Sequence, residues 1–308
     1  MSKPEGELRL GSAPEGYRSG FVSLVGRPNV GKSTLLNQIL RHKVAITSDR
    51  PQTTRNTIRG VYTTDEAQLV FVDTPGLHKP VTALGKRLNR AVRSTLGEVD
   101  AVVFLVDAAD GVGGGDAFIA DVLKDLKTPV VVALNKIDAA DGNEVAAARD
   151  RVRTLGGWPS FPTSGRSGAG VKELVEAIVA CLPEGPLYYP PDTLTDQPER
   201  TLVAELVREK VLELTHDEIP HSVAVVVDEM EPDDEETMTI DATIYVERES
   251  QKGIVIGKGG GLLKVVGTTA RKEIEALLGT HVFLRLRVKV ERDWQRRATM
   301  VDRFGYGS

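Results

Sequence analysis

Runs of apolar residues alternate with stretches of helical periodicity over roughly the first 180 residues of the chain. An unbroken apolar run of four to eight residues favours a buried strand, and apolar residues spaced three and four apart favour an amphipathic helix. Strands that alternate with helices predict an α/β domain, a mostly parallel sheet with helices on both faces. The predicted strands are 21–25, 68–72, 101–106, 129–134 and 160–162, and the predicted helices are 34–40, 82–96, 116–126, 144–155 and 171–182.

One pair of runs predicts an antiparallel edge on this sheet. Residues 58–62 and 68–72 are joined by the short segment 63–67, which suits a hairpin. The segment 183–200 then concentrates proline and polar residues, so we expect a linker there.

Beyond the linker the order changes to helix, strand, strand, helix, helix, strand, which predicts a smaller α+β domain. The expected organisation is a disordered extension at 1–19, a first domain at 20–182, the linker at 183–200, a second domain at 201–292 and a basic tail at 293–308. No apolar run approaches the length of a membrane span. The polar N-terminus has no signal-peptide core, so a cytoplasmic protein is expected.

Charge is unevenly distributed along the chain. The net charge is −5, yet residues 251–308 carry 12 Lys and Arg against 5 Asp and Glu. A basic end on an acidic protein indicates a polyanionic partner for that end. The single cysteine, Cys181, excludes an internal disulfide and a cysteine-based metal site.

The residues GRPNVGKS, 26–33, stand between a predicted strand and a predicted helix. In the spacing G-x-x-x-x-G-K-[ST], glycines let backbone N–H groups turn inward, and the next helix points its positive end at the same phosphate. Lys32 is expected to bridge the outer phosphates and the Ser33 hydroxyl to bind Mg²⁺. The residues expected to line this nucleoside triphosphate site are Gly26, Arg27, Pro28, Asn29, Val30, Gly31, Lys32, Ser33 and Thr34.

A second motif, Asp73-Thr74-Pro75-Gly76, follows the predicted strand 68–72. Asp73 then lies at the carboxyl end of a strand beside the phosphate loop, where it can hold Mg²⁺ through water. The Gly76 N–H can meet the terminal phosphate. The alternative is that these residues form an ordinary turn without a ligand. If they belong to the nucleotide site, the contacts expected here are Asp73, Thr74, Pro75, Gly76 and Leu77.

The motif Asn135-Lys136-Ile137-Asp138 follows the predicted strand 129–134 and specifies the base. Asp138 can accept hydrogen bonds from N1–H and the exocyclic amine of guanine, two donors that adenine lacks in this arrangement. A buried carboxylate left unpaired by the wrong base is costly, so the motif selects GTP over ATP.

Residues 44–58 form a polar stretch with little core-forming pattern. Such a segment suits a switch loop, in which a threonine closes on Mg²⁺ and the terminal phosphate and is released after hydrolysis. Thr53 and Thr54 are adjacent, and the sequence does not choose between them. A solvated surface loop is the alternative.

In the second domain, apolar residues lead into Gly257-Lys258-Gly259-Gly260 and then a helical stretch. In the KH module a G-x-x-G loop of this kind clamps a nucleic-acid backbone, because glycines allow close approach and a helix end favours phosphate. The element order matches the KH variant of prokaryotic proteins, and the surrounding charge is basic. The predicted RNA-binding residues are Lys252, Ile256, Gly257, Lys258, Gly259, Gly260, Lys264, Arg285, Arg287 and Lys289; for the last three, an ordinary solvated strand face is an equal alternative.

The segments GRPNVGKSTLLN, PQTTR and DTPGLH resemble the translation-factor-related GTPases and, among them, the group that comprises Era, TrmE and the tandem GTPase Der. The resemblance implies a catalytic set of Lys32, Thr54, Asp73 and Gly76, with Ser33, Thr54 and Asp73 around Mg²⁺. It also implies a guanine contact from Ser164, although Gly165 replaces the usual alanine after it.

Two residues, Leu77 and Asn29, bear on the expected rate of GTP hydrolysis. Leu77 stands where small signalling GTPases place a glutamine that orients water, so slow intrinsic hydrolysis is expected. In related GTPases an asparagine at the place of Asn29 helps to hold K⁺; the alternative is that Asn29 only shapes the loop.

A GTPase domain followed by a KH domain and a basic tail is similar to the Era branch over about residues 20 to 305, including VERESQKGIVIGKGG and RLRVKVERDW. This similarity implies binding to the 3′ end of 16S ribosomal RNA and a role in assembly of the 30S subunit. Peripheral inner-membrane attachment is reported for the family, but only a weak electrostatic contact through the basic tail is expected here. A monomer without an obligate protein partner is expected.

Two other functions stay open at this stage. One is a constitutive RNA-binding protein whose nucleotide is structural and rarely turned over, which Leu77 would suit. The other is a metabolic ATP-dependent enzyme, which would require Asp138 to be irrelevant.

Overall fold

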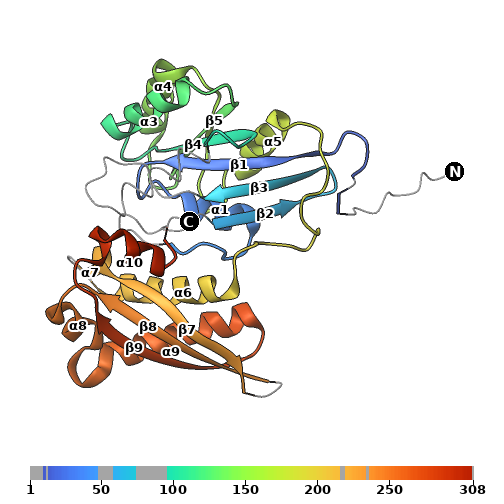
Figure 1. Ribbon diagram of the computed structural model, residues 1–308. Coiled ribbons are helices and arrows are strands. Elements are labelled where there is room, and N and C mark those ends of the chain that lie inside the picture. The colour runs from blue at the N-terminus through green and yellow to red at the C-terminus, as the bar shows by residue number, and fades with distance from the viewer. Residues whose placement is uncertain are drawn as a thin grey trace. The chain divides into compact units, whose positions relative to one another are not determined.

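The computed structural model describes residues 10–11, 13–47, 58–73, 96–215, 219–233 and 236–306 (Figure 1). They form two compact units. The first comprises the described residues through Ala45, then 58–73 and 96–196, and the second comprises residues 46–47 and the described residues from Gln197 onward. Each unit has its own hydrophobic core.

The first unit contains a six-stranded sheet in the order β2-β3-β1-β4-β5-β6. All neighbours are parallel except β2 and β3, which form the predicted antiparallel hairpin at the edge. The predicted α/β fold with a mostly parallel sheet is confirmed. The strands are β1 Arg18–Gly26, β2 Ile58–Thr63, β3 Ala67–Asp73, β4 Ala101–Asp107, β5 Val130–Asn135 and β6 Ser160–Pro162.

Helices cover both faces of this sheet (Figure 1). Helices α1, Lys32–Leu40, and α5, Val171–Cys181, share one core with the sheet. Helices α3, Gly114–Lys124, and α4, Gly142–Gly156, share the core of the opposite face. Strand β4 is therefore buried along its whole length, which explains its uninterrupted apolar sequence. The predicted helix 82–96 lies outside the described residues except for Leu96, which is buried.

The parallel register brings the strand ends that carry motifs to one edge of the sheet. Leu24 pairs with Asp73 between β1 and β3, and Asp107 pairs with Asn135 between β4 and β5. Because loops that follow parallel strands meet at the carboxyl edge, the phosphate loop and the Asn135 loop become neighbours.

The second unit is an α+β domain with a three-stranded sheet in the order β7-β8-β9, in which β8 is antiparallel to β7 and parallel to β9. Helix α9 begins at Gly261, directly after the Gly257–Gly260 loop, with Gly260 as its N-cap. The elements are α6 Glu199–Leu214, α7 Ile219–Ser222, β7 Ala224–Pro232, β8 Thr237–Val246, α8 Glu249–Ile256, the 3₁₀ turn η1 Lys258–Gly260, α9 Gly261–Leu278, β9 His281–Val290, the 3₁₀ turn η2 Trp294–Arg296 and α10 Ala298–Arg303.

Both ends of the described chain are more ordered than the sequence predicted. Tyr17 is buried and β1 begins at Arg18, so the predicted disordered extension 1–19 is too long; residues 1–9 and 12 lie outside the described residues. At the other end the predicted tail 293–308 carries a helix, and Trp294 is fully buried with its indole N–H donating to the Ser222 carbonyl at 2.8 Å. Aromatic burial, rather than charge, decides the structure of this segment.

The predicted linker 183–200 is also partly structured. Its residues up to 196 belong to the first unit. The buried Gln68 side chain accepts hydrogen bonds from the backbone N–H groups of Tyr188 and Tyr189 at 2.8 and 3.0 Å. A polar side chain inside the sheet therefore fixes a segment whose composition alone indicated a loose connection.

Candidate functional site

The phosphate loop, residues 26–33, connects β1 to α1 as the motif requires. Gly31 adopts φ +93°, and a Cβ atom at this position would lie 2.4 Å from Nδ2 of Asn135. Only glycine fits both the backbone conformation and the close approach. Gly31 is also the N-cap of α1, so the first N–H groups of this helix point into the loop and are available to an anion.

Lys32 lies inside this loop. Its side chain is buried, and its Nζ donates to the backbone carbonyls of Arg27 at 3.0 Å and Gly26 at 3.3 Å. A buried ammonium needs acceptors, and these carbonyls hold it on the concave side of the loop. The arrangement places a positive charge in an anion-binding turn.

For Mg²⁺, the donor set is described only in part. Ser33 is the second residue of α1, and Asp73 is the last residue of β3, where its backbone pairs with Ile58. A single hydroxyl next to a phosphate loop fits an ion that keeps phosphate and water ligands rather than an all-protein cage. The described part of the chain contains no cluster of three or more His, Cys, Asp and Glu residues suited to a metal.

Several predicted contacts lie outside the described residues, namely Thr53, Thr54, Thr74, Pro75, Gly76 and Leu77. Their roles stay predictions.

The predicted guanine contacts are brought together at the ends of β5 and β6. The Ser164 hydroxyl donates to Oδ1 of Asp138 at 2.6 Å, and the N–H of Ser167 donates to Ser164 Oγ at 2.9 Å. Ser164 is buried, whereas Asp138 is exposed at the rim. The prediction of guanine selectivity expected a buried carboxylate at this position. Because Asp138 is exposed, only a base bound over it would bury it.

Asn135 joins this base site to the phosphate loop. Its Nδ2 donates to the Val30 carbonyl at 2.8 Å, and its Oδ1 accepts from the Gly165 N–H at 3.0 Å. A Cβ at Gly165 would lie 2.9 Å from the Leu35 backbone nitrogen, so the glycine that replaces the family's usual alanine allows this loop to pack closely on α1. From the sequence we predicted Asn135 only as a nucleotide contact. No sequence pattern indicated that its side chain also joins the phosphate loop to the loop of Gly165.

Lys136 is held by an adjacent carboxylate. It adopts φ +64°, and its Nζ lies 2.6 Å from Oδ2 of Asp107, the last residue of β4. Asp107 also accepts from the N–H groups of Ala109 and Asp110 at 3.1 Å each. The Lys136 side chain is thus fixed beside the base site.

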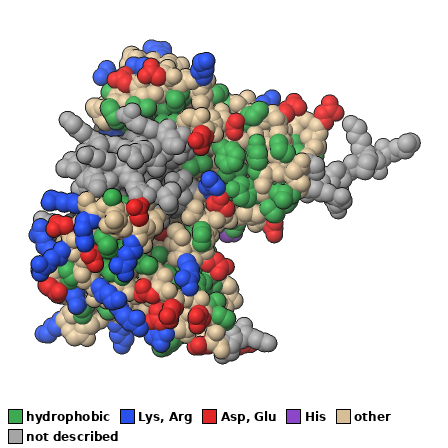
Figure 2. Space-filling model, viewed as in Figure 1, with side chains coloured by type: hydrophobic (Ala, Val, Ile, Leu, Met, Phe, Trp, Pro, Cys, Tyr) green, Lys and Arg blue, Asp and Glu red, His purple; other side chains and the backbone are tan. Residues whose placement is uncertain are grey.

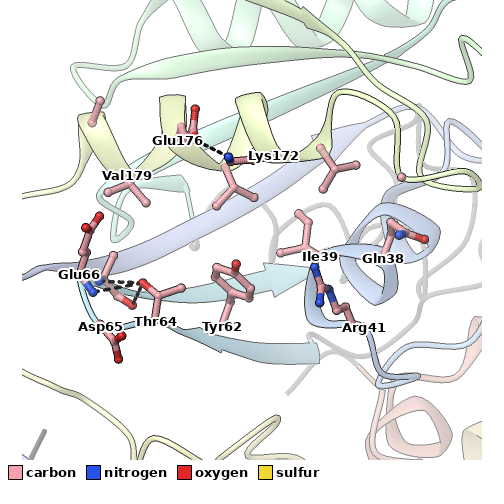
Figure 3. A pocket seen from close by; sticks show the side chains of 15 residues that line it. Gln38, Ile39, Arg41, Tyr62, Thr64, Asp65, Glu66, Lys172, Glu176 and Val179 are labelled. Atoms are coloured by element: carbon pink, nitrogen blue, oxygen red, sulfur yellow. Dashed lines mark hydrogen bonds and ion pairs between the residues drawn. The ribbon is translucent and has the colours of Figure 1, made fainter.

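A separate cavity of about 760 Å³ lies in the first unit between the end of α1, the β2–β3 hairpin and α5 (Figure 3). Tyr62 and Val179 project into it, and Lys172 pairs with Glu176 along α5 at 3.8 Å. None of the predicted nucleotide-binding residues lines this cavity.

The predicted KH loop joins α8 to α9 in the second unit. Gly257, Gly259 and Gly260 have φ of +73°, +59° and +79°. A Cβ at Gly257 would lie 2.8 Å from the Leu262 backbone nitrogen, whereas at Gly259 and Gly260 no atom lies within 4 Å. The loop is therefore fixed at its first glycine and open to solvent at the last two.

An open groove of about 390 Å³ begins at this loop and runs between α9 and β9. It contains the predicted Gly260 and Lys264, and Arg271, which the prediction missed. Arg271 lies two helical turns after Lys264, so helical periodicity could have identified it. The remaining lining residues are Leu263, Gly267, Thr268, Phe283, Leu284 and Leu286.

The surroundings of the groove are basic. Lys264 and Arg271 line it, and Figure 2 shows Lys and Arg side chains, with Asp and Glu among them, over the visible face of the second unit. Lys258 and Lys264 are exposed, and Lys252 and Ile256 on α8 are half-buried. A flexible polyanion can approach this surface without displacing buried side chains.

The three basic residues of β9 have a different orientation. Leu284 and Leu286 face the core under the helices, so the alternating Arg285, Arg287 and Lys289 lie on the opposite face of the sheet. Arg285 Nε donates to Oδ1 of the buried Asp241 at 2.9 Å, and Arg287 lies 3.4 Å from the same carboxylate. They stand apart from the groove, and their role in RNA binding stays a prediction.

In the part of the chain that the structure describes, no helix combines the length and apolar character needed to cross a bilayer.

Comparisons with known proteins match both units. The family model described as 50S ribosome-binding GTPase matches residues 21–136, and the KH domain model matches residues 218–295. The curated GTPase Era of Heliobacterium modesticaldum is 51% identical over 293 residues, which cover 95% of this chain and 98% of the relative.

Two solved structures match the described fold with a TM-score of 0.91 and cover 94% of this chain and 99% of theirs. One is a variant of Aquifex aeolicus Era bound to GDP·AlF4⁻, 42% identical. The other is Era in complex with MgGDPNP and nucleotides 1506–1542 of 16S ribosomal RNA, 41% identical. With its nucleotide motifs, its KH groove and these similarities over almost its whole length, the chain belongs to the Era family of GTPases.

Proposed function

We propose that this protein is a GTP-hydrolysing switch that binds 16S ribosomal RNA near its 3′ end and assists assembly of the 30S subunit. The observation that carries the proposal is the joining of Asp138, Ser164 and Asn135 to the phosphate loop in one hydrogen-bonded set. A guanine-selective group is thereby connected directly to a triphosphate cradle, which supports GTP as the ligand.

The residues of the first unit suggest how GTP is turned over. Lys32 places a positive charge where the outer phosphates would lie, and the α1 N-terminus adds backbone donors. Ser33, Thr54 and Asp73 would hold Mg²⁺, which neutralises charge on the β- and γ-phosphates. Leu77 cannot orient water, so intrinsic hydrolysis is slow; Asn29, with K⁺, is the proposed substitute, and Gly76 the proposed donor to the terminal phosphate.

The groove of the second unit supports single-stranded RNA as the other ligand. Gly259 and Gly260 leave room for a backbone phosphate, and Lys258 and Lys264 supply charge. A relative of 41% identity has been solved with nucleotides 1506–1542 of 16S ribosomal RNA, which favours the same RNA region for this chain. Binding of that region is what connects the protein to the 30S particle.

The switch is tested by measuring RNA affinity in two nucleotide states. A fluorescent RNA with the 3′-terminal sequence of 16S ribosomal RNA is titrated with protein loaded with a GTP analogue or GDP, and a scrambled RNA is the control. We expect tighter binding in one state, and by linkage the RNA must change nucleotide affinity by the same factor. Equal RNA affinities in the two states would contradict the switch.

Leu77 supports a second candidate, an RNA-binding protein with a nucleotide that is rarely turned over. Multiple-turnover phosphate release separates the two. The switch predicts release that cognate RNA or K⁺ stimulates, whereas the second candidate predicts less than one turnover over the lifetime of the complex.

We further propose a cytoplasmic monomer, with at most a weak peripheral contact between its basic C-terminal segment and anionic inner-membrane lipid. The 12 Lys and Arg against 5 Asp and Glu in residues 251–308 support that contact. Vesicle sedimentation with and without anionic lipid tests it.

A further inference from the structure

Arg27, the second residue of the phosphate loop, is bound by a buried carboxylate on α3. Its Nε lies 2.9 Å from Asp116, and its Nη2 donates to the Gly111 carbonyl at 3.0 Å. The Asp116 side chain has no exposed surface and also accepts from the Gly113 N–H at 2.8 Å. The guanidinium is therefore engaged on two sides.

The segment before α3 is shaped to receive this side chain. A Cβ at Gly115 would lie 2.7 Å from Cδ of Arg27, so a larger residue there would displace the arginine stem. Asp116 belongs to the first turn of α3, where its carboxylate also caps the helix. The contact is thus built from a loop, a helix start and a buried charge, unlike an exposed surface pair.

The main chain of Arg27 connects this contact to the nucleotide site. Its carbonyl accepts from Nζ of Lys32 at 3.0 Å. Arg27 thereby connects α3, through its side chain, to Lys32, through its main-chain carbonyl. Any movement of Arg27 would move an acceptor of Lys32.

We propose that Arg27 is a positioning residue, fixed by Asp116, that holds the first half of the phosphate loop and Lys32 in the geometry required for nucleotide binding. This inference rests on the proposed GTP-binding function. A loop held in advance loses less conformational freedom when the ligand binds, so the contact raises nucleotide affinity. The alternative is that Arg27 swings to the phosphates and acts on the reaction directly, which would leave the buried Asp116 carboxylate without its cation.

The test is a double-mutant cycle with Arg27→Gln, Asp116→Asn and the double variant. Dissociation of a fluorescent GDP and affinity for a GTP analogue are measured by stopped flow, well below the melting temperature of each nucleotide-free protein. We expect each single variant to weaken binding about 5- to 20-fold, mainly through faster dissociation, and the double variant to lose little more. Arg27→Lys should retain only part of the affinity, because an ammonium cannot reach both Asp116 and the Gly111 carbonyl.

The matched control lies on the same helix. Lys124 and Asp121 of α3 form an exposed pair at 2.9 Å, so Lys124→Gln should leave nucleotide binding unchanged. If the wild-type protein binds no guanine nucleotide, the proposed function itself fails. If the wild type binds and Arg27→Gln binds equally well, or if the two losses are additive, the positioning role is wrong. A fall in kcat with unchanged affinity would instead identify Arg27 as a group that acts on the phosphates.

Discussion

The two glycine loops of this protein, 26–33 and 257–260, both precede a helix whose N-cap is a glycine in the left-handed region. Around Gly31 the space is filled, because the Asn135 amide stands directly behind it. Around Gly259 and Gly260 the space is open. In both units a helix thus begins directly after glycines. Neighbouring atoms fill the space around the glycine in the first unit, whereas the corresponding space in the second unit is open.

This difference suits two kinds of anion. An enclosed loop with a buried lysine can surround the phosphates of one small molecule, and its anchoring side chains fix which molecule fits. An open loop beside a groove can accept one phosphate of a long chain that enters and leaves on either side. Specificity in the first unit should therefore depend on single buried contacts, and affinity in the second on the sum of exposed charges.

The largest expected effect is Asp138→Asn, at the exposed rim of the first unit's nucleotide site, where a bound base would cover the side chain. An asparagine offers one donor and one acceptor instead of two acceptors, so it mismatches guanine and matches xanthine. We expect GDP affinity to fall on the order of 10³-fold or more and xanthosine diphosphate binding to appear, as measured by competition against a fluorescent nucleotide. Ser164→Ala, which removes only the hydroxyl that donates to Asp138, should cost about 10-fold. Unchanged selectivity in Asp138→Asn would show that the base is bound elsewhere.

The second prediction applies one substitution to both loops. Gly31→Ala forces a Cβ to 2.4 Å from an amide that Val30 and Gly165 hold in place, at φ +93°. We expect a loss of about 3 kcal/mol in the stability of the first unit and a large loss of GDP affinity. Gly259→Ala meets no atom, so its cost should be only about 1 kcal/mol, from the left-handed backbone.

Denaturant unfolding of the nucleotide-free protein measures both changes. Equal losses of stability in Gly31→Ala and Gly259→Ala would contradict the contrast between a filled and an open loop.

The same contrast explains what could be predicted from sequence. The mostly parallel sheet, its antiparallel edge hairpin and the motifs at the strand ends followed from the apolar runs, because strand ends and loop spacing are local properties. The contacts of Asn135 with Val30 and of Arg27 with Asp116 join residues far apart in sequence, and neither residue type alone indicates its partner. Arg271, in contrast, could have been predicted as a groove residue, because it shares a helix face with Lys264.

Two segments, 183–200 and 293–308, are more ordered than their composition indicated, and the physical cause is the same for both. Composition marked residues 293–308 as a basic tail and 183–200 as a linker, but composition averages over the few side chains that decide burial. Trp294 packs edge to face against Phe304 with ring centroids 5.2 Å apart, and Gln68 accepts hydrogen bonds from the linker backbone. One buried aromatic or amide residue is enough to order a segment that is polar on average.

A smaller effect is expected at the open loop and its groove. Lys258→Gln in the loop and Arg271→Gln in the groove each remove one exposed charge, so we expect RNA affinity to fall about 3-fold and the slope of log K against log salt to decrease by about 0.7. Lys272→Gln is the control, since Lys272 is on α9 but belongs neither to the loop nor to the groove lining. Titrations of labelled RNA at several salt concentrations measure both quantities. A loss of more than about 100-fold for either variant would show that this surface, too, depends on single contacts.

The smallest expected effect is a pH dependence that only the enclosed loop should have. Burial raises the pKa of Asp116 above its ordinary value of 3.8, although hydrogen bonding and the Arg27 guanidinium oppose the shift. A carboxyl with a raised folded-state pKa contributes stability that is fully present below the unfolded pKa and is lost as pH rises through the folded pKa. The stability of the wild type relative to Asp116→Asn should therefore decline slightly as pH rises from below 3.8, in denaturant unfolding of the nucleotide-free protein. If this relative stability increased with pH instead, the Arg27 charge would lower the pKa of Asp116 by more than burial raises it. The phosphate loop would then be held chiefly by the charge of this pair rather than by its packing against α3.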